Sequence, residues 1–560
     1  MSNANLRHYA NIEDESTGEA FEEFRFDTVS GRRESIVIER ERADQAKEVR
    51  LQLRRFNADL SPKSDQSAQE IGEAINASPA RYFVHSARTG WREDDTAFVT
   101  PWETIDSKKR HRTILPPRSI NDAQRYGGRP QGDLASWKRY VAYPCGFSDL
   151  GMTMLAAAFT APVLKFADRQ SFGLHVHAAS KRGKSTMLIA ASSVGGVGRE
   201  EEMPNWSASS AAIGELCRLH CDRLMPINEA GLLAKKKAYA KIQSTIYQIA
   251  ESRERDRHSK SGFATTDDSA CFRIVFISNA EHPIDYYARL VDESRDEGEV
   301  ARCTEIPAVR HTRSTVIDRF PDDLPPNGRV AWARKLLNRI RKACKIHHGV
   351  ALPPVIRFLM KDPAKAKHFV GAYMNEFMDG LEVGKMSGAI QHAAANCSLI
   401  YAGGCIAVDA GVLDYDKRAL LRAIDRCFRD ALQTAEEARD PLLRAKRVLH
   451  RRLEGDRIFH MRSSRSSFDA CSFDGYVAKD VGKLKYVVRA KSLREWLKNE
   501  PGAFRGIIEW LARRGCLQPR QSRSSSSERR PTDWAERNLA WPDKRAIITR
   551  SVIFDDPFAK

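Results

Sequence analysis

Several features that would assign the chain to a class at once are missing from its sequence. No stretch approaches the roughly 18 consecutive apolar residues of a membrane span, and the polar, acidic amino-terminus carries no signal-peptide pattern. Cysteines in paired metal-ligand spacing are also missing, because Cys217 and Cys221 flank His220 without a second ligand pair at a zinc-like distance. We therefore expect reduced thiols in a cytoplasmic protein that contacts no membrane.

Acidic residues are in deficit. The chain has 91 lysines and arginines against 73 aspartates and glutamates, a net charge of +18. Such an excess suits a polyanionic partner, although charge alone reports non-specific attraction and not fold. The length of 560 residues allows about three or four domains, and a hydrophobic content of 42% allows sizeable cores.

The clearest motif lies at residues 174–186, where a short apolar run, a small-residue loop and a helical pattern follow one another. This layout predicts a P-loop, in which backbone N–H groups and a helix N-terminus bind the phosphates of a nucleotide. Gly183 lets the backbone curl, Lys184 supplies a cation for the β- and γ-phosphates, and Ser185 supplies a hydroxyl for Mg²⁺. The predicted nucleotide-binding residues are Ala178, Ala179, Ser180, Lys181, Arg182, Gly183, Lys184, Ser185 and Thr186.

The loop departs from the usual pattern at its first position, which is normally glycine and here is Ala178. Alanine tolerates positive φ poorly, so we expect a re-shaped loop. The alternative interpretation of the whole motif is a chance Gly-Lys-Ser-Thr at a helix start.

A second apolar run, Arg223–Ile227, ends in Asn228 and Glu229. P-loop ATPases carry an acidic pair at such a strand end, an aspartate for the Mg²⁺ shell and a glutamate that orients the attacking water. Asn228 lacks the charge of the aspartate, and Pro226 removes a hydrogen-bond donor from what should be an inner strand. A polar turn at the strand end is the alternative.

The run Arg273–Asn279 predicts a buried strand that ends in polar residues. Asn279 at its tip would be a sensor of the γ-phosphate, or the strand only packs and ends in a turn. A basic stretch just before it contains Arg253, Arg255, Arg257 and Lys260, which would lie near the pore of a ring and contact nucleic acid. A solvated face is the alternative interpretation.

The remaining patterns predict a domain order. Residues 1–20 read as a mobile tail, 21–130 as a small α/β domain, 131–330 as the ATPase domain with a buried Ala-rich helix, 331–455 as a helical lid, and 468–560 as a winged-helix-like domain. The second helix of that last domain would present Arg513 and Arg514 to DNA. An oligomerisation unit is its alternative interpretation.

Together the Gly-Trp and "TAFVTP" segments, the Ala-rich helix, "FGLHVHAASKRGKST", "WSASSAAIGELCRLHCDRLMPINEAG" and "FRIVFISNAEHPI" resemble the domain of unknown function 927 family. Its members are P-loop proteins of bacterial mobile elements and prophages, described as helicases or primase-associated ATPases. The resemblance covers roughly residues 20–520 and is strongest over 170–310. In this family a Gly-x-x-x-Arg segment follows the sensor strand, which implies Arg302 as a finger that reaches a neighbouring subunit.

The resemblance implies an α/β protein with a ring-forming, helicase-type ATPase core that uses ATP and Mg²⁺. The expected function is DNA unwinding or translocation for a mobile element, by a homo-oligomer, taken by analogy as a hexamer, with single-stranded DNA in its pore. Two alternatives stay open: a DNA-binding scaffold that binds nucleotide but hardly hydrolyses it, and a defence or regulatory NTPase.

Overall fold

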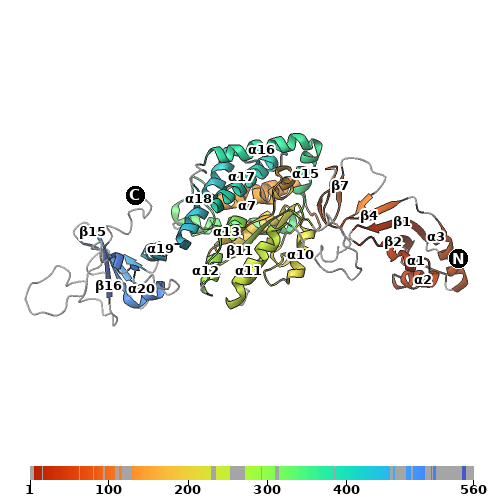
Figure 1. Ribbon diagram of the computed structural model, residues 1–560, viewed down its shortest axis with the longest axis horizontal. Coiled ribbons are helices and arrows are strands. Elements are labelled where there is room, and N and C mark those ends of the chain that lie inside the picture. The colour runs from red at the N-terminus through yellow and green to blue at the C-terminus, as the bar shows by residue number, and fades with distance from the viewer. Residues whose placement is uncertain are drawn as a thin grey trace, which may run out of the picture. The chain divides into compact units, whose positions relative to one another are not determined.

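The computed structural model of the chain divides into two compact units, Met1–Ala431 and Leu432–Lys560 (Figure 1). It describes residues 5–15, 17–61, 64–77, 79, 81–92, 95–106, 113–115, 129–228, 235–252, 271–291, 293–309, 314–381, 386–439, 441–453, 458–460, 475–480, 483–497, 506–507, 509–511 and 545–549.

The amino-terminal part of the first unit is a five-stranded sheet of order β3-β2-β1-β4-β8. Its strands are β1 (Arg7–Asp14), β2 (Ala20–Asp27), β3 (Arg33–Glu39), β4 (Tyr82–His85) and β8 (Thr113–Leu115). Three helices bury their apolar residues against Phe24, Phe26, Ile36 and Ile38 of the sheet. They are α1 (Arg40–Ala43), α2 (Ala46–Arg55) and α3 (Ser64–Asn76). The strands β2 and β3 pair antiparallel.

The prediction of a mobile tail over residues 1–20 is wrong, because β1 lies in the middle of this sheet. It pairs antiparallel with β2 and parallel with β4. Ala10 and Ile12 alternate with polar neighbours and are buried with Phe21 and Phe83 in a small apolar cluster. The overall polarity of the segment concealed this two-residue period.

A three-stranded sheet, β5 (Gly90–Trp91), β6 (Ala97–Val99) and β7 (Thr104–Asp106), follows in the chain. Trp91 fixes it to the central part of the unit. Its indole N–H donates to the carbonyl of Pro162 at 2.9 Å, and its backbone N–H donates to Asp222 at 2.9 Å. Asp222 is fully buried and is also paired with Arg273 at 2.7 Å.

The centre of the unit is a four-stranded parallel sheet of order β10-β11-β9-β12. The strands are β9 (Phe172–His177), β10 (Arg223–Ile227), β11 (Ile274–Ala280) and β12 (Cys303–Pro307). Since all four run in the same direction, their carboxyl ends lie along one edge, which is where α/β proteins bind ligands. The strands predicted over 174–177, 223–227 and 273–279 are confirmed.

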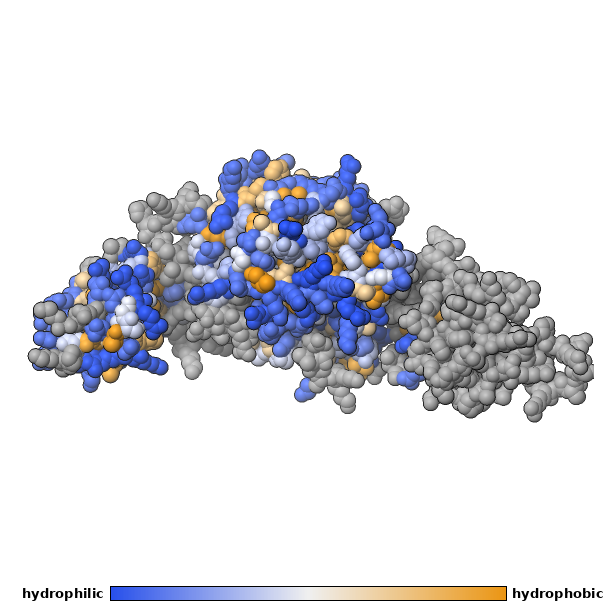
Figure 2. Space-filling view, turned by 180° about the vertical axis from the view of Figure 1, so that it is seen from behind, coloured by the Kyte–Doolittle hydropathy of each residue, from blue (hydrophilic) through white to orange (hydrophobic). Residues whose placement is uncertain are grey.

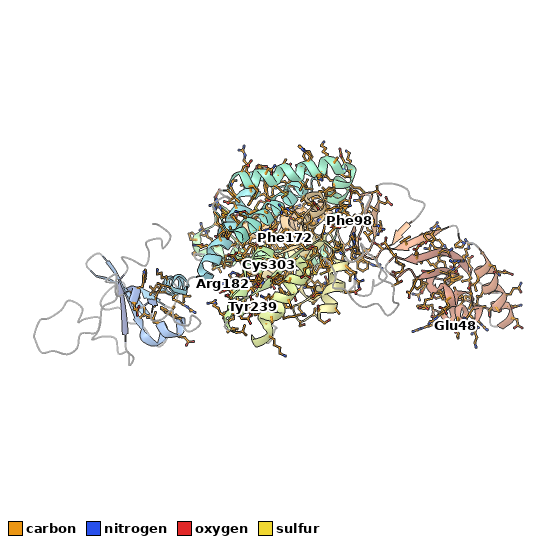
Figure 3. All side chains as sticks on the ribbon, viewed as in Figure 1. Glu48, Phe98, Phe172, Arg182, Tyr239 and Cys303 are labelled. Atoms are coloured by element: carbon orange, nitrogen blue, oxygen red, sulfur yellow. The ribbon has the colours of Figure 1, made fainter. Side chains whose placement is uncertain are left out.

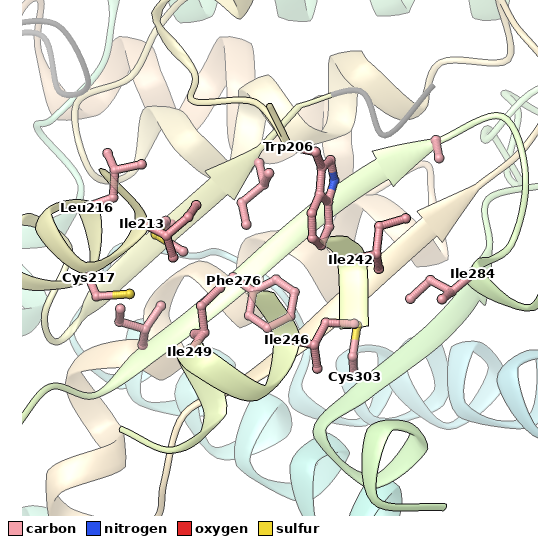
Figure 4. Packing of buried hydrophobic residues seen from close by; sticks show 14 of the residues in the cluster. Trp206, Ile213, Leu216, Cys217, Ile242, Ile246, Ile249, Phe276, Ile284 and Cys303 are labelled. Atoms are coloured by element: carbon pink, nitrogen blue, oxygen red, sulfur yellow. The ribbon is translucent and has the colours of Figure 1, made fainter. Parts of the chain in front are cut away.

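Helices cover both faces of this sheet. The helices α7 (Asp149–Thr160) and α9 (Lys184–Ser193) pack on one face against β10 and β11. On the other face, Ile242, Ile246 and Ile249 of α11 (Lys235–Ala250) pack over Phe276 of β11, and α10 (Ser210–Leu219) contributes Ile213 (Figure 4). The short helices α12 (Ile284–Arg289) and α13 (Glu297–Arg302) complete this layer.

The predicted Ala-rich helix is confirmed as buried. Asp149–Ala167 is the one helical stretch, among the described residues, that is long and apolar enough to cross a membrane, and 89% of it is buried inside the protein. The helix α17 (Gly388–Asp409) packs on α7, and α16 (Pro363–Asp379) packs on α17. The remaining helical elements of this part are α5 (Leu134–Trp137), η1 (Lys138–Ala142), α6 (Tyr143–Cys145), η2 (Ala161–Val163), α8 (Leu164–Ala167), η3 (Glu200–Glu202), η6 (Pro326–Gly328), α14 (Arg329–Ile346), α15 (Leu352–Lys361), α16 (Pro363–Asp379), α17 (Gly388–Asp409) and α18 (Lys417–Arg439).

The second unit contains a four-stranded sheet of order β13-β14-β15-β16. Its elements are α19 (Pro441–Leu453), β13 (Ile458–His460), β14 (Gly475–Asp480), β15 (Lys483–Arg489), α20 (Ala490–Trp496) and β16 (Arg545–Thr549). Strands and a first helix thus occur where the winged-helix pattern predicts them. The unit begins at Leu432, within α18, and not at residue 468. Most of the predicted second helix lies outside the described residues, so the winged helix stays a prediction.

Candidate nucleotide site

The loop 178–183 connects the end of β9 to the start of α9 at the carboxyl edge of the sheet. Its positive φ angles fall at Lys181 (63°) and Gly183 (105°), and Ala178 is not among the residues with positive φ. The backbone N–H of Ala178 donates to the carbonyl of Ala280 at 3.2 Å, which ties the start of the loop to the end of β11. An alanine therefore fits the first position, because the left-handed conformation is taken up further along the loop.

The end of the loop is closed by two other segments. A Cβ atom at Gly183 would lie 2.8 Å from Val316 Cγ2 and 2.9 Å from Leu337 Cδ1 of α14. Arg182 (labelled in Figure 3) donates from its guanidinium to the carbonyl of Ser314 at 2.7 Å, and its own carbonyl accepts from the N–H of Val316 at 3.0 Å. Residues 314–316 and α14 thus hold the loop against the start of α9.

Lys184 is the first residue of α9 and is 8% exposed. Within the described part of the chain its ammonium group has no hydrogen-bond or ion-pair partner. A nearly buried, unpaired cation is costly, and at a helix N-terminus it stands where an anion binds most favourably. Ser180, earlier in the loop, donates its hydroxyl hydrogen bond to Glu281.

The structure brings Asn279, the predicted sensor, to Ser185 of the helix start. Asn279 lies in β11, next to β9, and its side-chain N–H donates to the hydroxyl of Ser185 at 3.1 Å. Asn279 is 1% exposed, so the contact is shielded from water. A strand-tip amide that touches the helix carrying Lys184 and Ser185 can respond to what the loop binds.

Asn228 lies beyond β10, level with Asn279 in the neighbouring strand, since Ile227 pairs with Ser278. Its side-chain N–H donates to Glu200 at 3.3 Å, while its side-chain oxygen is buried without a hydrogen-bond partner in the described structure. The expectation that Pro226 breaks an inner strand is wrong, because β10 is the edge strand of the four. Proline is tolerated at a sheet edge, where its missing N–H breaks no ladder.

Oxygen donors suited to magnesium are present at this edge. Ser185 and Asn228 both offer neutral hard oxygens, and the unpartnered oxygen of Asn228 is the kind of group that a hydrated cation satisfies. In the described residues no group of three or more histidine, cysteine or acidic side chains could hold a metal by itself. Magnesium at nucleotide sites is bound largely by phosphates and water, so the residues fit the ion.

Arg302 lies away from this edge. It ends α13 directly before β12, whose first residue, Cys303, pairs with Gly173 near the start of β9. Its guanidinium donates to the carbonyl of Gly298 at 2.9 Å and lies 4.8 Å from the centre of the Tyr247 ring. Arg302 is therefore at the amino edge of the sheet and does not meet Lys184 of the same chain.

A buried polar network lies behind the site, on the α11 face of the sheet. His175 of β9 is fully buried, with one ring nitrogen 2.7 Å from the hydroxyl of Ser278, and burial lowers its pKa. Burial alone would raise the pKa of Glu305, but Arg295, paired with it at 3.0 Å, keeps that pKa lowered. Arg295 also pairs with Glu299 at 2.8 Å. The network thus places a buried histidine and a paired carboxylate on the α11 face of the sheet, beside the strand that carries Asn279.

Several predicted site residues lie outside the described residues: Glu229, Arg253, Arg255, Arg257, Lys260, Arg513 and Arg514. Their roles stay predictions. The face shown in Figure 2 is largely hydrophilic where it is described, with small separate apolar spots.

Fold and site together define an α/β protein whose parallel sheet carries a glycine-containing loop and a lysine-bearing helix start at its carboxyl edge. Residues 3–269 match the model of the family described as Domain of unknown function (DUF927). The resemblance predicted from the motifs is thereby confirmed over this part of the chain. The match ends before β11 and Arg302.

Among solved structures the chain is similar to one described as "SCCmec type IV Cch - active helicase". The identity is 15%, the TM-score is 0.53, and the match covers 93% of this chain and 91% of the other. Such a likeness shows a shared fold. No match is found among curated proteins.

Sequence reasoning missed three residues: Glu281, which accepts from Ser180 of the loop, Glu200, which accepts from Asn228, and Arg341, which pairs with Glu200. Glu200 belongs to a run of three glutamates, and such a run is indistinguishable in sequence from a solvated face. The hydrogen bond from Asn228 and the ion pair with Arg341 distinguish Glu200 from its two neighbours.

Proposed function

We propose that the protein is a P-loop ATPase that works as a DNA helicase or translocase of a mobile element. The observation that carries the proposal is Lys184, nearly buried and unpaired at the first position of α9, below a loop whose glycine adopts φ 105°. An anion of high charge density is the ligand that this arrangement stabilises best. The likeness to a structure described as an active helicase supports the motor function.

The strand order supports the same proposal. The strand that carries Asn279 lies between the strand of the loop and the strand that ends at Asn228. Asn279 and Asn228 thus line up along the carboxyl edge next to Ser185, as the sensor and metal positions require. Glu229, directly after Asn228, is the proposed group that orients the attacking water.

In the proposed reaction the N–H groups at the start of α9 and Lys184 bind the β- and γ-phosphates and stabilise the charge that develops on them. Magnesium, held through Ser185 and Asn228, would neutralise phosphate charge when bound. Asn279 positions the Ser185 hydroxyl and contacts the region of the γ-phosphate. Arg302 of a neighbouring subunit completes the site in an oligomer, which we propose to be a ring.

Lys184→Ala tests the proposal. We expect ATP turnover to fall by at least about 100-fold, the effect of removing one preorganised charge from phosphoryl transfer, with the fold intact by circular dichroism. Lys342→Ala, which removes an exposed lysine from α14, is the matched control and should leave turnover unchanged. Unaltered turnover in Lys184→Ala would refute the P-loop.

Single-stranded DNA added to the wild-type assay separates the motor from its rivals. Stimulated turnover with strand separation supports the helicase. Nucleotide binding without turnover would instead indicate a scaffold, which the neutral Asn228 favours. Turnover indifferent to DNA would indicate a regulatory NTPase.

A further inference from the structure

The candidate metal position contains a neutral side chain where a charged one is expected. Magnesium in nucleotide sites is bound through one or two carboxylates together with phosphates and water. Asn228 offers only an amide oxygen. The structure shows which carboxylate lies next to it.

The direction of the Asn228 side chain follows from strand register. Asn279 reaches Ser185 of α9, so its side chain lies on the α9 face of the sheet. Residues opposite each other in neighbouring parallel strands project to the same face, and Ile227 pairs with Ser278. Asn228, the next residue, is therefore level with Asn279 and on the same face, toward the helix that carries Ser185.

Asn228 holds one carboxylate on that face. Its side-chain N–H donates to Glu200 Oε1 at 3.3 Å, while Glu200 Oε2 lies 3.5 Å from a guanidinium nitrogen of Arg341 in α14. The two neighbouring glutamates are used differently. Glu202 accepts the backbone N–H groups of Gly198 and Arg199 at 3.1 Å, and Glu201 is exposed.

We propose that Glu200 supplies the negative charge that position 228 lacks, by binding water of the magnesium shell, and that Asn228 is the residue that positions it. The inference rests on the proposed nucleotide site. Asn228 is suited to the task, since an amide donates to the carboxylate through its nitrogen and leaves its oxygen for the ion's water. That oxygen is buried and unpartnered in the described structure.

Arg341 is the competing cation. The side chains of Arg341 and Glu200 are 43% and 31% exposed, and partly exposed ion pairs are weak. Glu200 can therefore exchange Arg341 for a divalent ion at little cost. Arg341 lies one turn beyond Leu337 in α14, and Leu337 packs against Gly183. The cation that Glu200 would exchange for the metal ion is therefore carried by the helix that packs against the proposed phosphate-binding loop.

Binding of Mn²⁺ as a magnesium probe, measured by electron paramagnetic resonance with a non-hydrolysable ATP analogue, tests the inference without turnover. We expect Glu200→Gln to weaken Mn²⁺ binding by about 10-fold, the usual effect of removing a group that supports a metal's ligands. Glu201→Gln is the matched control and should bind as the wild type does. Equal Mn²⁺ binding by Glu200→Gln and wild type would overturn the inference.

The double variant Glu200→Gln/Asn228→Asp separates metal binding from folding. The aspartate at position 228 should restore Mn²⁺ binding, because it returns the missing negative charge to the metal position. If Glu200→Gln only damaged the fold, a second substitution at position 228 would not restore Mn²⁺ binding. Failure of this rescue would also count against the inference. Binding of the ATP analogue measured in excess chelator reports the nucleotide site without the metal. We expect this binding in the wild type and its loss in Lys184→Ala. If that binding is intact while Glu200→Gln changes nothing, the inference fails and the proposed function stands. If the wild type binds no nucleotide, both fail.

Discussion

The shape of the loop 178–183, the proposed phosphate-binding loop, depends on where its backbone enters the left-handed region. Gly183 sits at φ 105°, which costs a residue with a side chain of the order of 1–3 kcal/mol. Lys181 sits at 63°, in the part of that region that non-glycine residues do visit. Glycine is thus required at the end of the loop, next to the helix, and not at its beginning.

Gly183→Ala should therefore weaken nucleotide binding and destabilise the first unit. The new Cβ would be 2.8 Å from Val316 and 2.9 Å from Leu337, so these side chains or the loop must move. We expect a loss of roughly 1–3 kcal/mol in the free energy of unfolding, measured by urea titration, and a lower affinity for a fluorescent ATP analogue. Gly371→Ala in α16, where a Cβ meets nothing within 4 Å, is the control and should leave affinity unchanged. Equal affinity in both variants would mean that the loop tolerates a side chain.

At the scale of residues, the sequence was informative where a polar side chain stands at the carboxyl end of a buried strand. Asn279 could be placed near the loop because the carboxyl ends of neighbouring parallel strands lie at the same edge of the sheet. Glu200 and Arg341 could not be predicted. Their significance comes from one hydrogen bond and one ion pair between segments that are far apart in the chain. Nothing in a run of glutamates or in a basic helix marks such a contact.

At the scale of elements, continuous apolar runs were predicted well, whereas polar or very short strands were predicted poorly. The strand at 274–280 is apolar on both faces apart from its tip and was recognised. In β10 the proline suggested an interrupted inner strand, because the order of strands is not written in any single segment. The strands that were missed include β1, which is polar overall, the three-residue strands β7, β8 and β13, and β12. Whether these segments form strands, and where each strand lies in its sheet, is decided by strand order and tertiary burial and not by the local sequence pattern.

The junction of α10 and β10 predicts an acid-sensitive region. His220 is 2% exposed, with a ring nitrogen 2.9 Å from the carbonyl of Leu224, and burial, helped by Arg223, lowers its pKa to about 3. The unfolded chain protonates this histidine near pH 6.5, so stability is complete above that pH and is lost as the pH falls toward 3. At pH 4.5 the loss from this one group is about 2–3 kcal/mol.

His220→Asn keeps a donor for Leu224 but has nothing to protonate. Urea unfolding followed by circular dichroism at pH 7.5 and 4.5 should show a smaller difference for this variant than for the wild type. His392→Asn, which replaces an exposed histidine of α17, should show the same difference as the wild type. Identical pH dependence in wild type and His220→Asn would place the acid sensitivity elsewhere.

At the scale of the molecule, the loop and the proposed arginine finger of one chain lie at opposite edges of the parallel sheet. Lys184 and Ser185 stand at the carboxyl edge, whereas Arg302 stands at the amino edge. The strands between them span several residues, so the guanidinium of Arg302 does not reach the loop of its own chain. An arginine that acts in catalysis from this position must act on another copy of the chain. The fold thus links the proposed hydrolysis to assembly.

Mixing two inactive variants tests this link. Arg302→Ala retains an intact loop and Lys184→Ala retains the arginine, so each can complete the other only across a subunit boundary. In a ring assembled from equal amounts, about a quarter of the boundaries join an intact loop to an intact arginine, and about a quarter of wild-type ATP turnover should return. In the control mixture Arg289→Ala takes the place of Arg302→Ala. Arg289 pairs with Asp285 at 2.9 Å in the layer that also contains α13. The Arg289→Ala variant by itself should keep its ATP turnover. No recovery in the mixture, with both variants shown by light scattering to assemble, would exclude Arg302 as a group that acts between subunits.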